Sequence, residues 1–513
     1  MSGFDIRAFI SAAADASVAG GPAAMRFRRR AVPTAEAVAP IVVRPSYSPA
    51  IVVGVARAVE FALVMLAGLV VYQIYLAANL LLDGAYWLAT AGAAALTILV
   101  FQAIGVYSVQ AFRSFFLYAL RIVAGWSLVF LVLLAAVFFA KVGDDFSRVW
   151  LAGWFVLGLG FLLVERIGLH VLVSSLTRNG RFDRRTAIVG GGELAESMIR
   201  ALKAQHDIGI QLVGIFDDRA EDRSPDVVSG YPKLGSVDDL VEYARRTSLD
   251  LIVFTLPISA ETRLLQILAK LWVLPIDIRL SAHSSKLRLR PRAYSYIGTV
   301  PLLDLFDKPI ADWDLVLKWL FDKIVGSAML LVLSPIFIAV AAAVKLDSRG
   351  PILFRQNRFG FNNELIEVFK FRSMYIDQAD ENAAKLVTKD DPRVTRVGRF
   401  IRKTSLDELP QLFTVVFKGN LSLVGPRPHA LHAKAEDRLY DQVVDGYFAR
   451  HRVKPGITGW AQVNGWRGET DTSEKIQKRV EHDLYYIDNW SVLLDLYILF
   501  KTPFALLASE NAY

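Results

Sequence analysis

Four long apolar runs stand out in the first third of the chain, at residues 51–78, 85–107, 117–140 and 149–175. Each is near the roughly 20 residues that a helix needs to cross the hydrocarbon core of a membrane. Arginines flank one set of ends (Arg26, Arg28, Arg29, Arg30, Arg44, Arg113, Arg121, Arg178, Arg181, Arg184 and Arg185). The other two loops carry Asp83, and Asp144 with Asp145 against Lys141 and Arg148. The positive-inside rule therefore predicts a four-helix transmembrane bundle with both ends facing the cytoplasm.

The pattern changes at Arg184, where short apolar runs begin to alternate with helix-like segments. Strands are expected at Thr186–Gly190, Gln211–Phe216, Leu249–Leu256 and Ile276–Leu280. This alternation is typical of a doubly wound, Rossmann-like α/β module.

A fifth apolar run, Ile324–Val344, contains twenty-one residues without a charge. Ser334 and Pro335 stand at its centre, where a proline removes a backbone hydrogen bond and kinks a helix. The Ser334 hydroxyl could satisfy the freed carbonyl. A fifth span would also carry the rest of the chain out of the cytoplasm. We therefore expect a kinked re-entrant membrane helix over residues 313–346.

The predicted organisation is a membrane α plus α/β fold. It comprises a disordered cytoplasmic tail (1–48), four transmembrane helices (49–181), the α/β module and its linker (182–311), and a monotopic C-terminal domain (312–513). The chain has 513 residues, of which 54% are hydrophobic, with a formal charge of +8 and no cysteine. The absence of cysteine excludes disulfides and thiolate chemistry. Together with the apolar runs, the positive charge favours a cytoplasmic membrane face and phosphate chemistry over nucleic acid.

The α/β module contains a glycine-rich turn, Gly190-Gly191-Gly192, after its first strand. Gly190 and Gly192 fit the spacing of a nucleotide-binding turn, and Asp217 or Asp218 follows the second strand, where a ribose-binding acid would lie. Tight strand-to-helix turns also use glycine for structural reasons. A regulatory or scaffolding role is therefore favoured over nucleotide binding, which stays open.

Two adjacent carboxylates, Asp407 and Glu408, lie within the segment Thr404–Pro410. Ser405 and Glu408 match a capping box, but Pro410 would then be the fifth helical residue, where its ring clashes with the preceding turn. We expect the helix to start at Asp407 instead. Asp407 would then lie at the positive end of the helix.

Many cations surround these carboxylates in the C-terminal sequence. They are Arg355, Arg358, Lys370, Arg372, Arg393, Arg396, Arg399, Arg402, Lys403, Arg427, Arg450, Arg452 and Lys454. Any one of them alone would be a solvated surface charge. As a set, interleaved with Gly-Pro turns, they predict a pyrophosphate-binding surface.

Four segments resemble those of the bacterial sugar transferase family, the monotopic polyprenyl-phosphate hexose-1-phosphate transferases. They are Phe369–Met374 (FKFRSM), Thr404–Pro410 (TSLDELP), Leu423–Pro428 (LVGPRP) and Lys454–Asn464 (KPGITGWAQVN). The preceding helices and α/β module resemble the large subclass of this family. The segment Gly465–Asp471 and the ending Asn511–Tyr513 look most like its undecaprenyl-phosphate glucose phosphotransferases.

The resemblance implies that Asp407 attacks the β-phosphorus of UDP-glucose, releases UMP and passes glucose-1-phosphate to undecaprenyl phosphate. It implies Mg²⁺ held by Asp407 or Glu408, and an enzyme of the bacterial inner membrane that works on the cytoplasmic face and starts exopolysaccharide repeat units. It also implies membrane-lipid contact and a homodimer. The residues expected to bind substrate or phosphate are Lys370, Arg372, Arg402, Arg427 and Asp483.

Three alternatives remain open from the sequence. The donor could be UDP-galactose, since no residue can be assigned to the hydroxyl that distinguishes it from UDP-glucose. The protein could be a non-catalytic membrane scaffold whose α/β module senses a nucleotide. An NAD-dependent sugar-modifying enzyme is disfavoured because the module lacks a Tyr-x-x-x-Lys pair.

Overall fold

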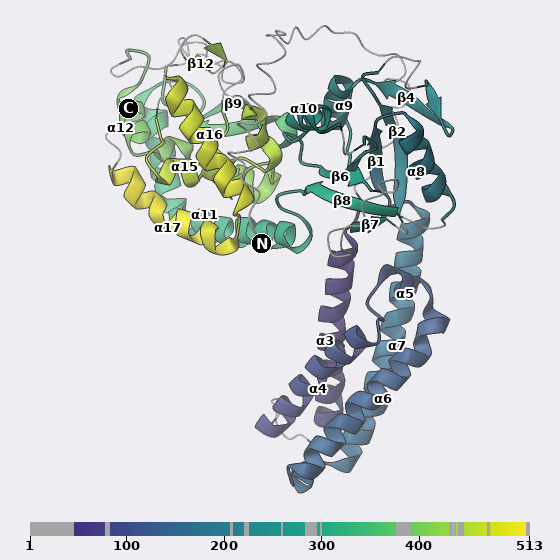
Figure 1. The fold of residues 1–513 in the computed structure, drawn as a ribbon. Helices are drawn as coiled ribbons and strands as arrows, with labels where there is room; N and C mark the ends of the chain where they lie inside the picture. Colours follow the sequence, from purple (N-terminus) through teal and green to yellow (C-terminus); the bar gives the residue numbers. More distant parts are fainter. Residues whose placement is uncertain are drawn as a thin grey trace. The chain divides into compact units, whose positions relative to one another are not determined.

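The computed structural model describes residues 46–76, 83–205, 209–219, 225–257, 260–282, 295–297, 300–375, 391–429, 434–435, 438–439, 446–468 and 472–508. The chain separates into two compact units, one formed by Arg44–Arg184 and one that contains Arg185–Tyr513 (Figure 1). The predicted disordered tail lies outside the described residues, except for its last three positions.

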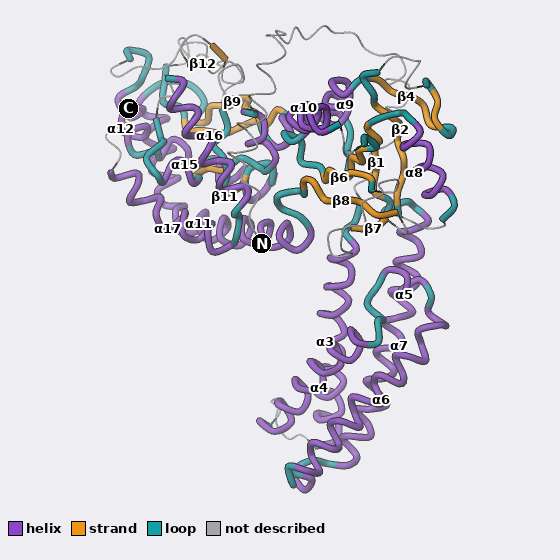
Figure 2. Tube along the Cα trace, viewed as in Figure 1, coloured by secondary structure: helices purple, strands orange, loops and turns teal. Residues whose placement is uncertain are grey.

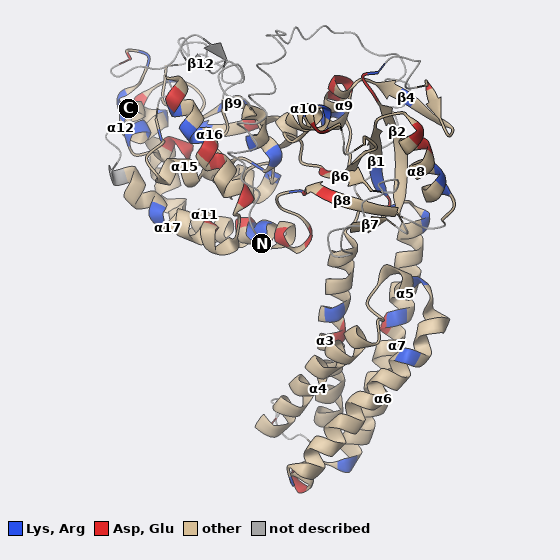
Figure 3. Ribbon diagram, in the orientation of Figure 1, with Lys and Arg blue, Asp and Glu red and all other residues tan. Residues whose placement is uncertain are grey.

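The first unit is helical. Its long helices are α3 (Pro49–Tyr75), α4 (Gly84–Ala103), α6 (Phe115–Phe139) and α7 (Arg148–Arg178), with the short α5 (Val109–Arg113) before α6 and a single turn, η1 (Gly143–Asp145), before α7. The four long helices coincide with the four predicted apolar runs. Figure 3 shows how few charged residues these helices carry. Two of them, Glu60 and Arg166, are buried and paired with each other, which lowers the cost of a charge in apolar surroundings.

Tryptophans fill the centre of this helical unit. Trp126, Trp150 and Trp154 are fully buried. Each indole N–H donates to a backbone carbonyl, Trp126 to Phe155 at 2.9 Å, Trp150 to Gly68 at 2.9 Å and Trp154 to Val64 at 3.0 Å. A buried indole therefore contributes apolar packing without leaving its polar atom unpaired.

The α/β module is built on one eight-stranded sheet of order β3-β4-β2-β1-β5-β6-β8-β7. Its elements are β1 (Arg184–Val189), α8 (Glu193–Lys203), β2 (Ile210–Phe216), β3 (Val227–Val228), β4 (Tyr231–Gly235), α9 (Val237–Arg246), β5 (Leu251–Phe254), α10 (Glu261–Leu271), β6 (Asp277–Ser281), β7 (Ser295–Ile297) and β8 (Val300–Phe306). The strand pairs β1–β5, β5–β6 and β2–β4 are parallel, whereas β8 runs antiparallel to β6 and β7. All four predicted strands are present, and the antiparallel edge makes the sheet mixed.

Both faces of this sheet are covered because alternate strand residues point to opposite sides. In β1, Ala187 and Val189 pack with the buried residues of α9 and α10, whereas Ile188 packs with those of α8 (Figure 1). Apart from Arg184, the first residue of β1, the described strands belong to the unit that contains Arg185–Tyr513 (Figure 2).

The C-terminal domain surrounds a single hydrophobic core. Its elements are α11 (Asp312–Asp347), β9 (Leu353–Phe359), η3 (Phe361–Asn363), β10 (Leu365–Phe371), α12 (Arg396–Lys403), η5 (Leu406–Glu408), α13 (Gln411–Phe413), η6 (Thr414–Lys418), β11 (Ser422–Val424), β12 (Lys434–Ala435), β13 (Arg438–Leu439), η7 (Tyr447–Arg452), β14 (Gly456–Thr458), α15 (Trp460–Val463), α16 (Ser473–Asp488) and α17 (Val492–Ala508). Strands β9 and β10 pair antiparallel, and β11 pairs with β14 in parallel.

Helix α11 continues through the proline at which a break is predicted. Pro335 lies inside it, so the carbonyl of Leu331, four residues earlier, loses its usual amide donor. The Ser334 hydroxyl donates to that carbonyl at 2.7 Å. The predicted compensation is confirmed.

Among the described residues, five helices are long and apolar enough to cross a membrane: α3, α4, α6, α7 and α11. The protein is therefore a membrane protein.

Candidate active site

The segment around Asp407 is helical, but not in the expected way. Ser405 has the left-handed conformation (φ 58°) and its side chain caps no amide, so the capping box is absent. A 3₁₀ turn, η5, begins at Leu406, one residue before the predicted start. Because 3₁₀ turns bond to the third preceding residue, Pro410 follows without breaking an α-helical ladder. The chain then continues through the short α13 and η6. The predicted start of an α-helix at Asp407 is therefore wrong, because Asp407 lies inside a 3₁₀ turn.

Glu408 is held by two cations. Its carboxylate accepts from the Lys370 Nζ of β10 at 2.8 Å, and from the Arg427 guanidinium at 2.5 and 3.1 Å. Burial alone would raise the pKa of Glu408, but the charges of Arg427 and Lys370 lower it well below its usual value. Glu408 therefore stays ionised and fixes the two cations beside Asp407.

Asp407 is different from its neighbour. Among the described residues, its carboxylate makes no hydrogen bond or ion pair. Its pKa is raised, chiefly by burial and further by the charge of Glu408, although Lys370, Arg402 and Arg427 pull it down. A half-buried carboxylate that keeps its oxygens free and is poorly solvated is suited to act as a nucleophile.

Three of the five predicted phosphate-binding residues thus surround this carboxylate pair: Lys370, Arg427 and Arg402, which lies on α12. The structure places the other two elsewhere, with different roles.

Arg372 is buried beneath the C-terminal end of α11. Its guanidinium donates to the carbonyls of Arg349 at 2.7 Å and Ser348 at 2.6 Å, and to that of Val344 at 3.4 Å. Arg372 therefore secures the end of a helix, where cations are favoured. The prediction that Arg372 binds phosphate is corrected, because its guanidinium is engaged by these carbonyls.

Asp483 is also buried, 2% exposed, and faces Arg450 rather than the carboxylate pair. The Arg450 Nη2 donates to Asp483 Oδ2 at 2.6 Å and to the backbone carbonyl of Arg427 at 2.7 Å. Asp483 therefore supports the backbone that carries Arg427, and its predicted contact with substrate is replaced by this supporting role.

The structure contains a cavity where the nucleotide site of the α/β module is predicted. A cavity of about 180 Å³ opens at the ends of β1, β2 and β5, and α9 and α10 complete its lining. Gly190 lines it with φ +104°, a conformation that favours glycine. The cavity lies where the strand order reverses, the usual ligand position in such folds.

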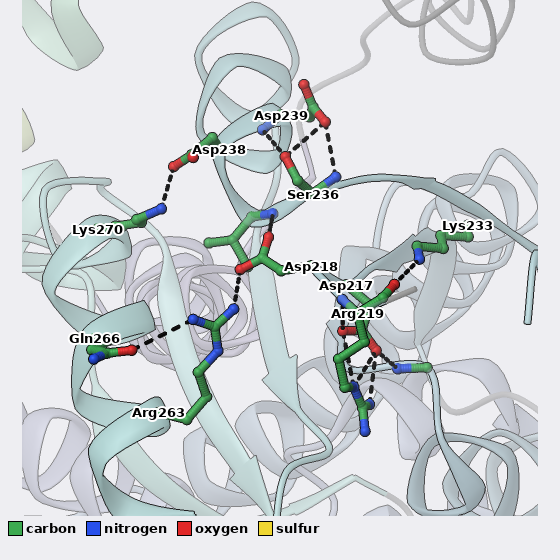
Figure 4. A network of polar contacts seen from close by, with 12 residues as sticks. Asp217, Asp218, Arg219, Lys233, Ser236, Asp238, Asp239, Arg263, Gln266 and Lys270 are labelled. Atoms are coloured by element: carbon green, nitrogen blue, oxygen red, sulfur yellow. Dashed lines mark hydrogen bonds and ion pairs between the residues drawn. The ribbon is translucent and has the colours of Figure 1, made fainter. Parts of the chain in front are cut away.

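Asp217, the acid expected to bind a ribose, already accepts hydrogen bonds from the protein itself (Figure 4). The Asp217 carboxylate accepts from the Gly191 amide at 2.7 Å and from the Arg219 guanidinium at 2.7 to 3.1 Å. Asp218 accepts from the Val237 amide and pairs with Arg263. Gly192 is the N-cap residue that precedes α8, and a Cβ there would lie 3.6 Å from an Arg219 nitrogen. Asp217 thus organises the glycine turn and has no free oxygen for a ribose.

Comparison with known proteins decides the family. A family model described as "Bacterial sugar transferase" matches residues 313–509, and one described as "CoA-binding domain" matches residues 102–282. The chain is 37% identical over 429 residues to a UDP-glucose:undecaprenyl-phosphate glucose-1-phosphate transferase of Klebsiella pneumoniae, covering 82% of this chain and 89% of that protein. The chain belongs to the bacterial sugar transferase family.

Two further relatives are also named as undecaprenyl-phosphate sugar phosphotransferases. This sugar transferase is 40% identical over 370 residues to an undecaprenyl-phosphate glucose phosphotransferase of Komagataeibacter xylinus, covering 70% of this chain and 66% of that protein. It is 30% identical over 429 residues to an undecaprenyl-phosphate galactose phosphotransferase of Salmonella typhimurium, covering 78% and 84%. Relatives named for glucose and for galactose are therefore both similar to this sugar transferase.

The predicted Mg²⁺ can be tested against the side chains of this sugar transferase. No cluster of three or more His, Cys, Asp or Glu residues that could hold a metal occurs among the described residues. Both oxygens of Glu408 are engaged by cations, which leaves Asp407. Mg²⁺ is commonly held by one carboxylate together with substrate phosphates and water, so Asp407 fits the ion and Glu408 fits it poorly.

The sequence analysis assigns no specific role to two residues of the site. Arg467 donates to the Ser405 hydroxyl, and Arg450 supports Arg427. Arg450 was counted only as one of many cations. Arg467 lies within the segment Gly465–Asp471. Its position in that family-like segment was the feature that could have pointed to it.

Proposed function

We propose that this sugar transferase moves glucose-1-phosphate from UDP-glucose to undecaprenyl phosphate, and so starts a polysaccharide repeat unit. The observation that carries the proposal is the free Asp407 carboxylate beside a Glu408 that is clamped by Lys370 and Arg427. The names of the glucose-specific relatives support the choice of substrates.

The chemistry would proceed in two displacements. In the first, an Asp407 oxygen attacks the β-phosphorus of the donor, a bond forms between them, and the bond to the bridging oxygen breaks so that UMP leaves. In the second, a phosphate oxygen of undecaprenyl phosphate attacks the same phosphorus and Asp407 leaves. Each displacement builds negative charge on phosphoryl oxygens, which Lys370, Arg402 and Arg427 are placed to offset.

A Mg²⁺ ion is part of this proposal. When bound with the donor diphosphate, it would neutralise phosphate charge, and Asp407 is the side chain that fits it.

We also propose that α11 enters and leaves the membrane on one side. Both halves of the helix pack against the same domain. The Asp322 carboxylate accepts from the Leu423 amide at 3.1 Å, and Phe337 lies 5.8 Å from Phe371 between ring centres. A helix that crossed roughly 30 Å of hydrocarbon would separate these two contacts. With four preceding spans, this arrangement keeps the site on the cytoplasmic face of the inner membrane.

The test uses the full chain in lipid nanodiscs with UDP-glucose, Mg²⁺ and undecaprenyl phosphate. UMP release and formation of the lipid-linked glucose phosphate are expected, and Asp407→Asn should abolish both. UMP release that persists in Asp407→Asn would refute the nucleophile. Faster transfer from UDP-galactose than from UDP-glucose would establish the alternative donor, and no release from either would favour a non-catalytic scaffold.

A second proposal concerns the α/β module, whose cavity we infer to hold a nucleotide. Support comes from the position of the cavity, and from Arg219 and Arg263 at its lining. Since Asp217 and Asp218 are engaged, the ligand would be held by arginines and apolar contacts. Binding of ADP or UDP that is lost in Ala260→Trp, which should fill the cavity, but kept in Gln266→Ala on the same helix would support this role.

A further inference from the structure

The cations of the active site differ in how much hydrogen-bonding capacity they have left. Lys370 and Arg427 direct their charge at Glu408. One Arg467 nitrogen donates to the Ser405 hydroxyl. Another, Nη1, is buried and has no hydrogen-bond partner among the residues that the structure describes. Arg467 is therefore a cation whose donors are only partly used.

An unfilled guanidinium nitrogen is costly when buried. A donor removed from water without a replacement partner destabilises the folded protein, and a charged donor does so more strongly. Burial also lowers the pKa of Arg467, and the neighbouring charge of Arg427 lowers it further. The arrangement makes energetic sense when an anion fills the remaining position.

Arg467 lies beside the turn that carries Asp407 and Glu408. It follows Gly465, which has a left-handed backbone (φ +90°), and its charge acts on Asp407 and Glu408. Its partner Ser405 is a non-glycine residue with φ 58°, and such strain persists only where surrounding contacts hold it. The guanidinium thus bridges to the turn that presents Asp407.

We propose that Arg467 binds a phosphate oxygen of a substrate at this site. A guanidinium with free donors matches phosphate geometry better than an ammonium does. Two sources share this chemistry, the diphosphate of the nucleotide sugar and the phosphate of the polyprenyl lipid. The inference rests on the proposed transferase function, and the experiment distinguishes the two sources.

The experiment measures UDP-glucose binding to full-length Asp407→Asn in nanodiscs, where the displacement is blocked. Adding Arg467→Ala should weaken the Kd about 10- to 100-fold, because a charged hydrogen bond is lost, and Arg467→Lys should lie between. The otherwise native chain with Arg467→Ala gives KM for undecaprenyl phosphate, and a rise confined to that KM identifies the lipid phosphate.

Two controls separate binding from positioning. Lys478→Ala removes a surface cation of the same domain, paired with Glu481 at 3.0 Å, and should change neither constant. Ser405→Ala removes the bridge but leaves the guanidinium, so UDP-glucose Kd should change less than about threefold, well below the loss of a charged bond. Thermal unfolding of each variant verifies folding, and Arg467→Lys serves if Arg467→Ala does not fold.

Two results would overturn the inference: unchanged Kd and KM in Arg467→Ala, or equal losses in Ser405→Ala and Arg467→Ala. Failure of the transferase function would appear separately, as absent or Asp407-independent UMP release, and would leave the binding comparison interpretable.

Discussion

At the scale of single residues, the two adjacent carboxylates have opposite environments. Glu408 is surrounded by cations that lower its pKa, whereas burial raises the pKa of Asp407. Opposed shifts of this kind assign different roles to neighbouring acids. Glu408 holds the cations, and in the proposed mechanism Asp407 is the carboxylate that reacts.

This contrast predicts the acid limb of the pH profile. In the proposed mechanism Asp407 must be ionised to attack, and its raised pKa means that protonation begins at a higher pH than for an ordinary aspartate. Glu408 does not titrate there because its pKa is lowered. The rate of UMP release under subsaturating UDP-glucose should therefore fall as pH decreases, starting above the usual aspartate range. A rate that stays constant down to the ordinary pKa of aspartate would contradict the assignment.

Asp483 and Arg450 predict a large stability effect. Removing one partner of a buried ion pair leaves an uncompensated charge, which costs about 3–5 kcal/mol. Asp483→Ala should therefore lower the thermal unfolding midpoint of the protein in nanodiscs, whereas Glu474→Gln, an exposed change on the same helix, should leave it unchanged. Equal midpoints in the two variants would show that the pair does not hold the Arg427 backbone.

At the scale of elements, helix α11 illustrates how a broken hydrogen-bond ladder is repaired. Ser334→Ala should destabilise the protein by about 1 kcal/mol, because the Leu331 carbonyl then lacks a donor. In a Pro335→Ala background that carbonyl regains a backbone amide, so the same change should cost less. Denaturation of the four-member mutant cycle in detergent measures the difference, and equal costs in both backgrounds would refute the compensation.

Helical elements were predictable to different degrees. The apolar runs gave α3, α4, α6 and α7 because length and hydrophobicity are local properties. The turn at Leu406–Glu408 was mispredicted because the choice between 3₁₀ and α-helical bonding depended on the left-handed Ser405, whose side chain is bonded to Arg467. That contact joins residues 62 positions apart.

At the scale of the whole molecule, the lack of cysteine makes the topology testable. Single substitutions Asp314→Cys and Arg349→Cys on either side of the apolar run should both react with a membrane-impermeant maleimide only from the cytoplasm. Asp83→Cys, between the first two predicted spans, should react only from the periplasm. Labelling of Arg349→Cys from the periplasm would contradict the re-entrant helix.

The sequence by itself determined the apolar helices, the α/β module and the pairing of Ser334 with the carbonyl that Pro335 leaves free, and it drew attention to Asp407 and Glu408. These features follow from periodicity, proline chemistry and contiguous motifs. Tertiary structure alone decided which cations serve the site. Lys370 and Arg427 reach Glu408 across 38 and 19 positions, whereas Arg372 and Asp483 turn to other partners. A cation has the same appearance in a sequence wherever it points, and only the packing of distant segments fixes the anion it meets.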